Sequence, residues 1–426
     1  MKNFVRISVL LVLCATSLFS LTLSEVIALA LENSDKVKEQ EHLSAQSKNL
    51  MYSQYAKLSP KLDLRYSVTQ SNRSIGDYTI SLTDLNASFN LFNGLKDFYT
   101  IKQYQSLLSA QNYLYEATRE DIILLAKTLY IQILQARDNL AISTESIRLL
   151  ELQRNQAEEF YKQGIRAKSD LLSVEVTLAN AKITQSNDKN ILNYALLSLQ
   201  KLIMREVNVN TLEPLSLQAD TEKLNFKYED LQRQMFASRS EYLYMQQLLN
   251  ALDLQKKALW SAFLPSLDVN YSRLWYKRSA ATPTYSGANL NSRAQLSLSW
   301  NLFSGLSDKF AIEVKGYEKL AAQSQMSDLK KELNLSLNKA LDDLNTAKTQ
   351  YSVAKNAVKM AQENYKIVQN RYKQNIETSR ELLNAEVALS QARLHFNQSE
   401  HKINLALANL ERIIQNPLQD YQNTQK

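Results

Sequence analysis

The 426-residue chain has few of the residues that interrupt regular structure, with only 6 glycines and 5 prolines. So few breakers in so long a chain favour long uninterrupted helices over an α/β fold with many short connections. The chain also has a single cysteine, Cys14, which lies in the N-terminal segment. Without that segment the chain cannot form a disulfide bond, so a disulfide-stabilised scaffold is excluded.

Residues suited to catalysis or metal binding are also scarce. The three histidines are His42, His395 and His401, and the last two are six positions apart, which places them on different faces of a helix. The sequence has no glycine-lysine-serine loop for phosphate and no glycine-rich turn for a dinucleotide. Its seven methionines are scattered and suggest no copper site. We therefore expect no enzyme, no cofactor and no bound metal.

Charge and hydropathy limit the remaining classes of protein. The formal net charge is only +7, and basic residues alternate with acidic ones, so no nucleic-acid partner is expected. Residues 1–20 resemble a secretory signal peptide, with Lys2 and Arg6 before an apolar core. No later stretch has the about 20 apolar residues of a membrane-spanning helix. We expect an exported protein that is periplasmic, secreted or a β-barrel of the outer membrane.

The sequence does contain an internal duplication. The motif Phe-Asn-Leu-Phe-Asn-Gly-Leu at 89–95 returns as Trp-Asn-Leu-Phe-Ser-Gly-Leu at 300–306, which is 211 positions later. Two more motifs recur at the same offset, Tyr-Lys-Gln at 161–163 and 372–374, and Leu-Leu-x-x-Glu-Val at 171–176 and 382–387. A strand start, Pro-x-Leu-Asp, also occurs twice. Self-similarity over half a chain indicates duplication of one structural unit.

The duplication predicts the organisation of the chain. We expect a signal peptide at 1–20, a first repeat at 21–206, a linker at 207–227, a second repeat at 228–415 and a polar tail at 416–426. Each repeat should contain a strand pair followed by long helices, with strands at about 61–92 and 266–303 and helices at about 96–206 and 306–415. Residues 22–25, Thr-Leu-Ser-Glu, form the capping box of a short first helix.

Both strand regions alternate apolar with polar residues, and their strands reach the ~9–11 residues that cross a bilayer when tilted. Ile80 and Leu82 break the alternation, so we expect a bulge or register change near Thr83. Half of a soluble sandwich would alternate in the same way. However, four strands cannot close a barrel alone, so closure would require several chains. Aromatic residues crowd the strand ends as in the girdles of membrane barrels, namely Phe89, Phe92, Trp275, Trp300 and Phe303.

The helical regions carry a seven-residue apolar repeat, for example Ala126, Ile133 and Ile147 in the first copy. A strict seven-residue repeat indicates coiled-coil packing, although long coiled coils are often plain spacers. Each long helix is interrupted once, at Gly164 in the first copy and at Asn375 in the second. Glycine and asparagine are the residues that end helices in a left-handed conformation, so each copy is expected to form a helical hairpin.

The chain resembles the TolC family of outer-membrane efflux and secretion channels, because these motifs occur in the same order and each occurs twice. The resemblance implies a mixed fold, a membrane β-barrel plus a long α-helical coiled-coil barrel, in which a homotrimer shares one twelve-stranded barrel. It implies an outer-membrane location with a long periplasmic part, in contact with outer-membrane lipid. The implied function is a passive, gated exit duct of a tripartite efflux pump or type I secretion system. Its implied partners are a periplasmic adaptor and an inner-membrane exporter of the RND or ABC type.

The resemblance also implies roles for particular residues. The helix breaks would be periplasmic tips that contact the adaptor through Lys162, Gly164, Ile165, Lys373, Asn375 and Ile376. The gate candidates are Tyr161, Arg166, Asp170, Tyr372, Arg380 and Glu381. The strand-to-helix junctions would be Gly94 and Gly305. The sequence departs from the family pattern, because Glu377 stands where a basic latch residue is expected and Asn384 where an acidic one is.

Two alternatives stay open at this stage. Residues 378–381, Thr-Ser-Arg-Glu, also read as an ordinary capping box, so the carboxylates at the helix starts have a purely structural explanation. The whole chain could instead be a periplasmic coiled-coil adaptor whose strands form a small soluble domain. A single adaptor hairpin would not explain two full copies of strand pair and hairpin, so the channel is the leading hypothesis. The sequence does not indicate the cargo.

Overall fold

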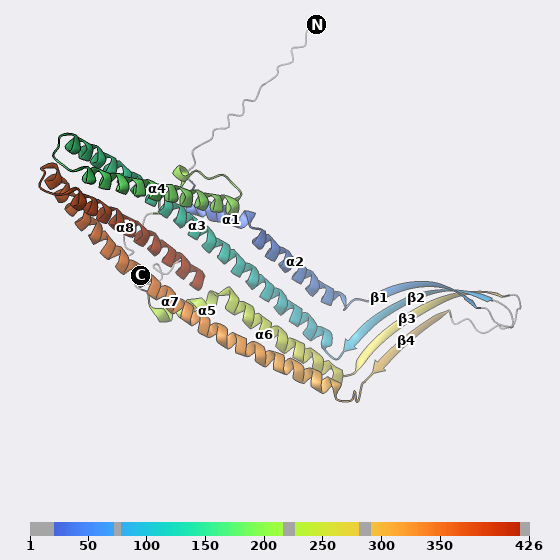
Figure 1. Cartoon of the computed structure of the whole chain (residues 1–426). Helices are drawn as coiled ribbons and strands as arrows, with labels where there is room; N and C mark the ends of the chain where they lie inside the picture. The colour runs from blue at the N-terminus through green and yellow to red at the C-terminus, as the bar shows by residue number, and fades with distance from the viewer. Residues whose placement is uncertain (1–20, 72–77, 216–225, 281–290, 418–426) are drawn as a thin grey trace, which may run out of the picture. The chain divides into compact units, whose positions relative to one another are not determined.

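A computed structural model describes residues 21–71, 78–215, 226–280 and 291–417 (Figure 1). The predicted signal peptide, and all but the first two residues of the predicted tail, lie outside the described residues. The chain forms two compact units. Unit 1 comprises Met1–Ser34, Asp121–Phe226 and Lys339–Arg412, and unit 2 comprises Asp35–Glu120, Lys227–Asn338 and Ile413–Lys426. Each unit therefore draws on both sequence repeats.

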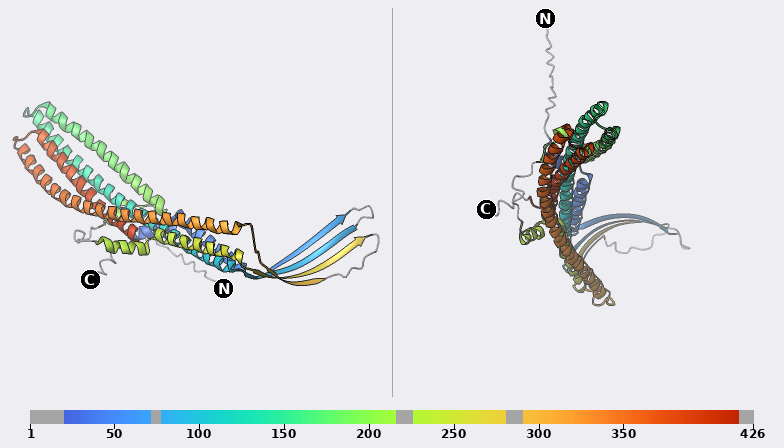
Figure 2. Two further views of the ribbon diagram at one scale, coloured as in Figure 1. Left: turned by 90° about the horizontal axis from the view of Figure 1, so that it is seen from below. Right: turned by 60° about the vertical axis from the view of Figure 1, so that its left-hand side comes forward.

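One antiparallel sheet lies in unit 2. Its strands follow the chain order β1-β2-β3-β4, so β1 and β4 are its edges. The bounds are β1 Lys61–Ser71, β2 Tyr78–Asn93, β3 Ser266–Ala280 and β4 Ser292–Ser299. The left view of Figure 2 shows these strands side by side in a curved sheet. The middle pairing, between β2 and β3, joins the two sequence repeats.

The register gathers apolar residues on one face of the sheet, which also carries Arg273 opposite Leu85. Leu64 pairs with Leu85, and Leu267 pairs with Leu298. Residues directly opposite each other in an antiparallel pair project to the same face. Leu64 and Leu298 are each 71% exposed in the single chain. The sheet therefore presents an uncovered apolar face, which water does not favour.

The predicted irregularity near Thr83 is in the wrong place. The β1–β2 register runs without a shift from Lys61↔Ser88 to Ser71↔Tyr78. The register shift lies instead between Asn90 and Phe92, in the pairing of β2 with β3. Because side chains alternate with a period of two, an unbroken register past Thr83 leaves Ile80 and Leu82 on the face opposite Leu85.

The bulge at Asn90–Phe92 has a clear effect on the aromatic residues. Phe89 pairs with Val269, and Phe92 pairs with Leu267. Val269 and Leu267 are two positions apart and therefore share a face of β3. The inserted residue thus brings Phe89 and Phe92 onto the same apolar face, although their spacing of three would otherwise separate them.

The last strand is shorter than predicted. The sequence predicts a strand to about residue 303, but β4 ends at Ser299, which pairs with Ser266 at the start of β3. Pro265 precedes that start and has no N–H to donate, so the partner strand goes no further. Trp300 and Phe303 therefore follow the strand and are 61% and 77% exposed. The Trp300 indole donates a hydrogen bond to the Phe263 carbonyl at 3.2 Å.

Unit 2 also contains helices that pack along the N-terminal parts of the two longest helices. Its own helices are α2 Asp35–Ala56, α5 Tyr228–Ser238, α6 Ser240–Leu259 and the short η3 Trp260–Phe263. The long helices α3 (Lys96–Lys162) and α7 (Ser307–Lys373) enter unit 2 with their N-terminal parts. Gln105 of α3 donates to Tyr55 of α2 at 2.7 Å, and Asp253 of α6 pairs with Lys319 of α7 at 2.6 Å.

Unit 1 holds the remaining helices. These are α1 Leu23–Asn33, α4 Lys168–Ile203, η1 Val209–Thr211 and α8 Ser379–Ile414 except for its last two residues, with the C-terminal parts of α3 and α7. The capping box of α1 is confirmed, because Thr22 and Glu25 each accept a hydrogen bond from the other's backbone N–H. Ala126 and Ile133 are fully buried, as a coiled-coil seam requires. No helix in the described residues combines the length and apolar character of a membrane span.

Two glycines connect strand to helix in a left-handed conformation, Gly94 at φ +55 and Gly305 at φ +66. A Cβ added at Gly94 would lie 2.8 Å from the Ser261 carbonyl oxygen and 3.0 Å from the Leu264 Cβ. A Cβ added at Gly305 would meet nothing within 4 Å. The two junctions therefore share a backbone conformation but differ in their surroundings.

This difference predicts unequal effects of the same substitution. Gly305→Ala should cost about 1–2 kcal/mol, because a side chain disfavours the left-handed region. Gly94→Ala should cost clearly more, because the Ser261 backbone must also move. Thermal unfolding of the two purified variants measures the difference. Equal unfolding midpoints would show that the contact at Ser261 does not restrict residue 94.

Candidate functional site

The candidate site lies in unit 1 at the turns that end the two long helices, between α3 and α4 and between α7 and α8. Gly164 and Asn375 adopt the left-handed conformation, at φ +70 and +60. The Ile165 N–H donates to the Phe160 carbonyl at 2.9 Å, and the Ile376 N–H donates to the Arg371 carbonyl at 3.0 Å. Both turns are thus closed by the same six-residue hydrogen bond of a helix C-terminus.

A group of side chains, here named the turn cluster, joins the two turns. It consists of Phe160, Arg166, Tyr372, Glu377 and Ser379. The Tyr372 ring packs edge to face on Phe160, with ring centres 5.7 Å apart, and its hydroxyl lies 3.2 Å from the Ser379 hydroxyl. Arg166 covers the Tyr372 ring at 5.7 Å and donates to the Glu377 carbonyl oxygen at 2.5 Å. One turn therefore holds the other through a cation and a hydrogen bond.

The two predicted gate tyrosines occupy different environments. Tyr372 is 1% exposed, whereas Tyr161, its equivalent in the first repeat, is 42% exposed. Tyr372 is covered because Arg166 and Phe160 reach it from the other hairpin. The duplication therefore places two tyrosines at the turns, but only Tyr372 belongs to the turn cluster.

The predicted acidic residues lie at the starts of α4 and α8. Asp170 is 4.0 Å from the Arg166 guanidinium, at the margin of an ion pair. Glu381 is exposed, and its backbone N–H donates to the Thr378 hydroxyl at 3.3 Å, which is the capping interaction expected from the sequence. Arg380 is also exposed. Among the described contacts, none joins Glu381 or Arg380 to the turn cluster, whereas Arg166 and Tyr372 are its centre.

The residues predicted as adaptor contacts remain accessible. Ile165 is 47% exposed and Ile376 is 60% exposed. The other four, Lys162, Gly164, Lys373 and Asn375, are exposed as well. Lys162 pairs with Glu158 at 3.1 Å, and this hydrogen bond raises the pKa of the lysine. Each turn therefore presents one isoleucine and one lysine on its surface.

Polar contacts link α3 to α8 along unit 1, and the sequence analysis did not anticipate them. From one end to the other they are Asp121–Arg412, Lys127–Glu411, Asp138–His401, Asn139–Asn397 and Ser146–Glu386. A heptad pattern identifies the apolar seam but does not reveal which polar residues sit beside it. The sequence contained one signal, the charged residue Glu386 within the segment Leu-Leu-Asn-Ala-Glu-Val-Ala-Leu, whose other residues are apolar except Asn384.

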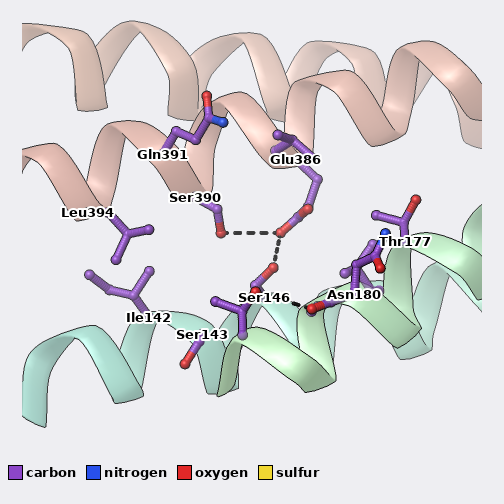
Figure 3. A pocket seen from close by; sticks show the side chains of 13 residues that line it. Ile142, Ser143, Ser146, Thr177, Asn180, Glu386, Ser390, Gln391 and Leu394 are labelled. Atoms are coloured by element: carbon purple, nitrogen blue, oxygen red, sulfur yellow. Dashed lines mark hydrogen bonds between the residues drawn. The ribbon is translucent and has the colours of Figure 1, made fainter. Parts of the chain in front are cut away.

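Glu386 is the most deeply buried carboxylate of this series, at 2% exposure. Figure 3 shows it reaching from α8 toward Ser146 of α3. The Ser146 hydroxyl donates a short hydrogen bond to Glu386 Oε1, and the Ser390 hydroxyl donates a longer one at 3.4 Å. Burial raises the pKa of Glu386, and the two hydrogen bonds and the charge of Arg393 only partly oppose this.

The raised pKa predicts how stability depends on pH. The native state holds the Glu386 proton more tightly than the unfolded chain does, so this contribution is complete below the usual carboxyl pKa and is lost as the pH rises through the native value. Glu386→Gln, which keeps the shape but cannot ionise, should therefore gain stability relative to wild type as the pH rises from about 5 to about 8. Thermal unfolding across that range measures this, and a difference independent of pH would contradict the prediction.

The family model described as "Outer membrane efflux protein" matches residues 26–203 and 233–415. In structure the chain is similar to the Campylobacter jejuni CmeC outer membrane channel, with 17% identity, a TM-score of 0.78 and coverage of 95% of this chain and 89% of that chain. It is also similar to VceC of Vibrio cholerae, with 14% identity, a TM-score of 0.78 and coverage of 92% and 95%.

A third similar structure is the open state of the Neisseria gonorrhoeae MtrE outer membrane channel. It has 16% identity, a TM-score of 0.76 and coverage of 93% of this chain and 89% of that chain. At these identities the likeness concerns the fold alone, and it extends over nearly the whole length of each protein. The search among curated proteins gave no match.

Proposed function

The chain belongs to the outer membrane efflux protein family, and from this premise we propose that it acts as a homotrimer whose twelve strands close one barrel. Members of this family are efflux channels and not enzymes, so the chain is an exit duct of the outer membrane. This membership decides against the soluble periplasmic adaptor. We propose in addition that three copies close the barrel, that the duct has a gate and that it works with two kinds of partner protein.

The observation that carries the trimer proposal is the open sheet of unit 2. Among the described strands, β1 and β4 are the edges, and each leaves backbone N–H and C=O groups without a neighbouring strand on its outer side. In a bilayer such groups have no water to bind, so a spanning sheet has to close. Pairing β4 of one copy with β1 of the next satisfies both edges. The uncovered face that contains Leu64 and Leu298 then meets lipid.

We place the gate at the turn cluster and the adaptor contact at the exposed residues beside it. Arg166, covering Tyr372 and bound to the Glu377 carbonyl, would hold the two hairpins together in the closed state. Ile165 and Ile376 offer apolar surface to a periplasmic adaptor. The adaptor would link the duct to an inner-membrane exporter of the RND or ABC type. With an exporter of the ABC type, the duct would act in type I secretion.

Photo-crosslinking in intact cells tests the partner assignment. Probes replace Lys162 and Asn375 at the turns, and a control probe replaces Lys331, which is exposed in unit 2. We expect a periplasmic adaptor to be captured from the two turn positions and not from the control. An adaptor of a proton-driven exporter would indicate small-molecule efflux, and one of an ATP-driven exporter would indicate protein or large-molecule secretion. Trimeric protein without capture at either turn would refute the tip assignment.

The acidic residues at the turns give a separate electrical test. If Asp170 and Glu381 form a ring at the tunnel entrance, Asp170→Asn with Glu381→Gln should lower cation selectivity and weaken block by multivalent cations several-fold, because a ring of charge concentrates counter-ions. The control is Asp328→Asn, which removes one exposed charge in unit 2. Single-channel recording in planar bilayers measures both properties. Currents identical to wild type would remove these residues from the entrance.

A further inference from the structure

A pocket of about 190 Å³ lies in unit 1 between α3, α4 and α8. Its lining includes Ile142 and Ser146 of α3, Thr177 of α4, and Glu386 and Leu394 of α8 (Figure 3). We propose that this pocket binds a small organic cation, in which an ammonium group is carried on a compact apolar body. The inference rests on the structure of unit 1 and not on the proposed gate or partners.

The volume of the pocket sets the size of the ligand. A cavity of about 150 Å³ in a protein core accommodates a molecule the size of benzene. The 190 Å³ found here therefore suits a single ring with one short substituent. Ile142, Leu150, Val387 and Leu394 line it with aliphatic side chains, which favour an apolar body over a strongly hydrated one.

The charge of the ligand follows from Glu386. Glu386 is 2% exposed, and the hydrogen bonds that its carboxylate accepts come from two neutral hydroxyls, those of Ser146 and Ser390. Within the part of the chain that the structure describes, no ion pair involves this carboxylate. The charge of Arg393 acts on this carboxylate only from beyond ion-pair distance. A buried carboxylate with no cation in direct contact is unfavourable, and an ammonium group would both neutralise it and form charge-assisted hydrogen bonds.

In the first repeat, the equivalent carboxylate has a cationic partner. Glu175 is the equivalent of Glu386 at the 211-residue offset, and it lies 3.6 Å from Arg154. The equivalent of Arg154 in the second repeat is Tyr365, whose hydroxyl accepts from Gln153 at 3.3 Å. The second copy of the motif has thus kept the carboxylate and replaced its basic partner. The pocket beside Glu386 is where an external cation could take that role.

A metal ion fits this pocket less well than an ammonium group. Calcium requires six to eight oxygen ligands, and magnesium requires a near-octahedral set. The pocket supplies one carboxylate and uncharged oxygens, and the described residues contain no cluster of three or more acidic, histidine or cysteine side chains suited to a metal. The aliphatic walls also favour a ligand with an apolar body.

Binding of benzylamine, which is protonated near neutral pH, tests the inference on the full chain purified in detergent. Its neutral counterpart, benzyl alcohol, has nearly the same shape. We expect wild type to bind benzylamine about tenfold more tightly than benzyl alcohol, as one charge-assisted contact allows. Glu386→Gln should lose that preference, and Glu175→Gln should retain it because Glu175 is outside the pocket lining. Equilibrium dialysis measures the dissociation constants, and all variants share the same partition of ligand into detergent.

A second variant keeps the inference testable if Glu386→Gln assembles poorly. Ala181 lines the pocket from α4, so Ala181→Leu should fill it while leaving Glu386 in place. We expect this variant to lose binding of both ligands by about tenfold, because the space for the ring is removed. Benzylamine binding that is equal in wild type, Glu386→Gln and Ala181→Leu would overturn the inference. So would equal affinity of wild type for benzylamine and benzyl alcohol.

Discussion

Leu296→Arg should sharply reduce the yield of assembled trimer in the outer membrane. Leu296 lies on the uncovered apolar face of the sheet, is 66% exposed and pairs with Val269 across the β3–β4 ladder. If this face meets lipid, an arginine there should cost roughly 2–4 kcal/mol per copy near the middle of the bilayer, and a trimer contains three copies. The fraction of protein that remains trimeric in outer-membrane preparations measures the effect.

The same strand provides the control. Arg293 lies on the opposite face of β4, which therefore accepts an arginine. Gln295→Arg, also on the opposite face, should therefore assemble close to the wild-type level. Two results would contradict the assignment of faces, namely normal assembly of Leu296→Arg and loss of assembly only in Gln295→Arg.

Tyr372→Ala should open the closed duct. Tyr372 is almost fully buried, and the substitution removes its packing on Phe160, its contact with Arg166 and its hydroxyl contact with Ser379. Loss of a buried aromatic ring costs about 3–5 kcal/mol. Because the turn cluster joins the two hairpins, we expect most of this loss to appear as a higher open probability in planar bilayers. Cells that carry the variant should also become sensitive to large antibiotics that the outer membrane excludes.

The duplication supplies a matched control for this experiment. Tyr161→Ala changes the equivalent residue, but Tyr161 is 42% exposed and should cost no more than about 0.5 kcal/mol. Tyr372→Phe keeps the ring and removes only the hydroxyl, so its effect should be intermediate, at about 1 kcal/mol. Equal open probabilities for Tyr372→Ala and Tyr161→Ala would place the gate elsewhere.

Local sequence rules predicted the parts of the fold that local forces determine. The turns at Gly164 and Asn375 follow from the left-handed conformation that these residues tolerate, and the capping box of Thr22 and Glu25 follows from spacing alone. The bulge could not be placed from alternation. A register shift near Thr83 was one way to accommodate Ile80 and Leu82, and the pairing with β3 places the shift beyond Asn90 instead.

The positions of the two turns were predictable from the sequence, but the side-chain contacts between the turns were not. The duplication predicts the same role for Tyr161 and Tyr372, because they occupy equivalent positions in the two repeats. The sequence does not indicate which of the two rings is covered by side chains of the opposite hairpin. The same limit applies to Glu175 and Glu386, which occupy one motif but meet Arg154 in one copy and two serines in the other. These differences arise from tertiary packing, which breaks the symmetry of a duplicated sequence.

Arg166 contacts the opposite hairpin through a main-chain acceptor and not through a side chain. Arg166 donates to the main-chain carbonyl of residue 377, and the Glu377 side chain turns instead to Arg371 at 3.2 Å. Every amino acid supplies that carbonyl, so the link between the hairpins does not constrain the identity of residue 377. An acidic residue therefore stands where a basic one was expected without loss of the link. The link between the hairpins therefore depends on the side chains of Arg166 and Tyr372 and only on the backbone of residue 377.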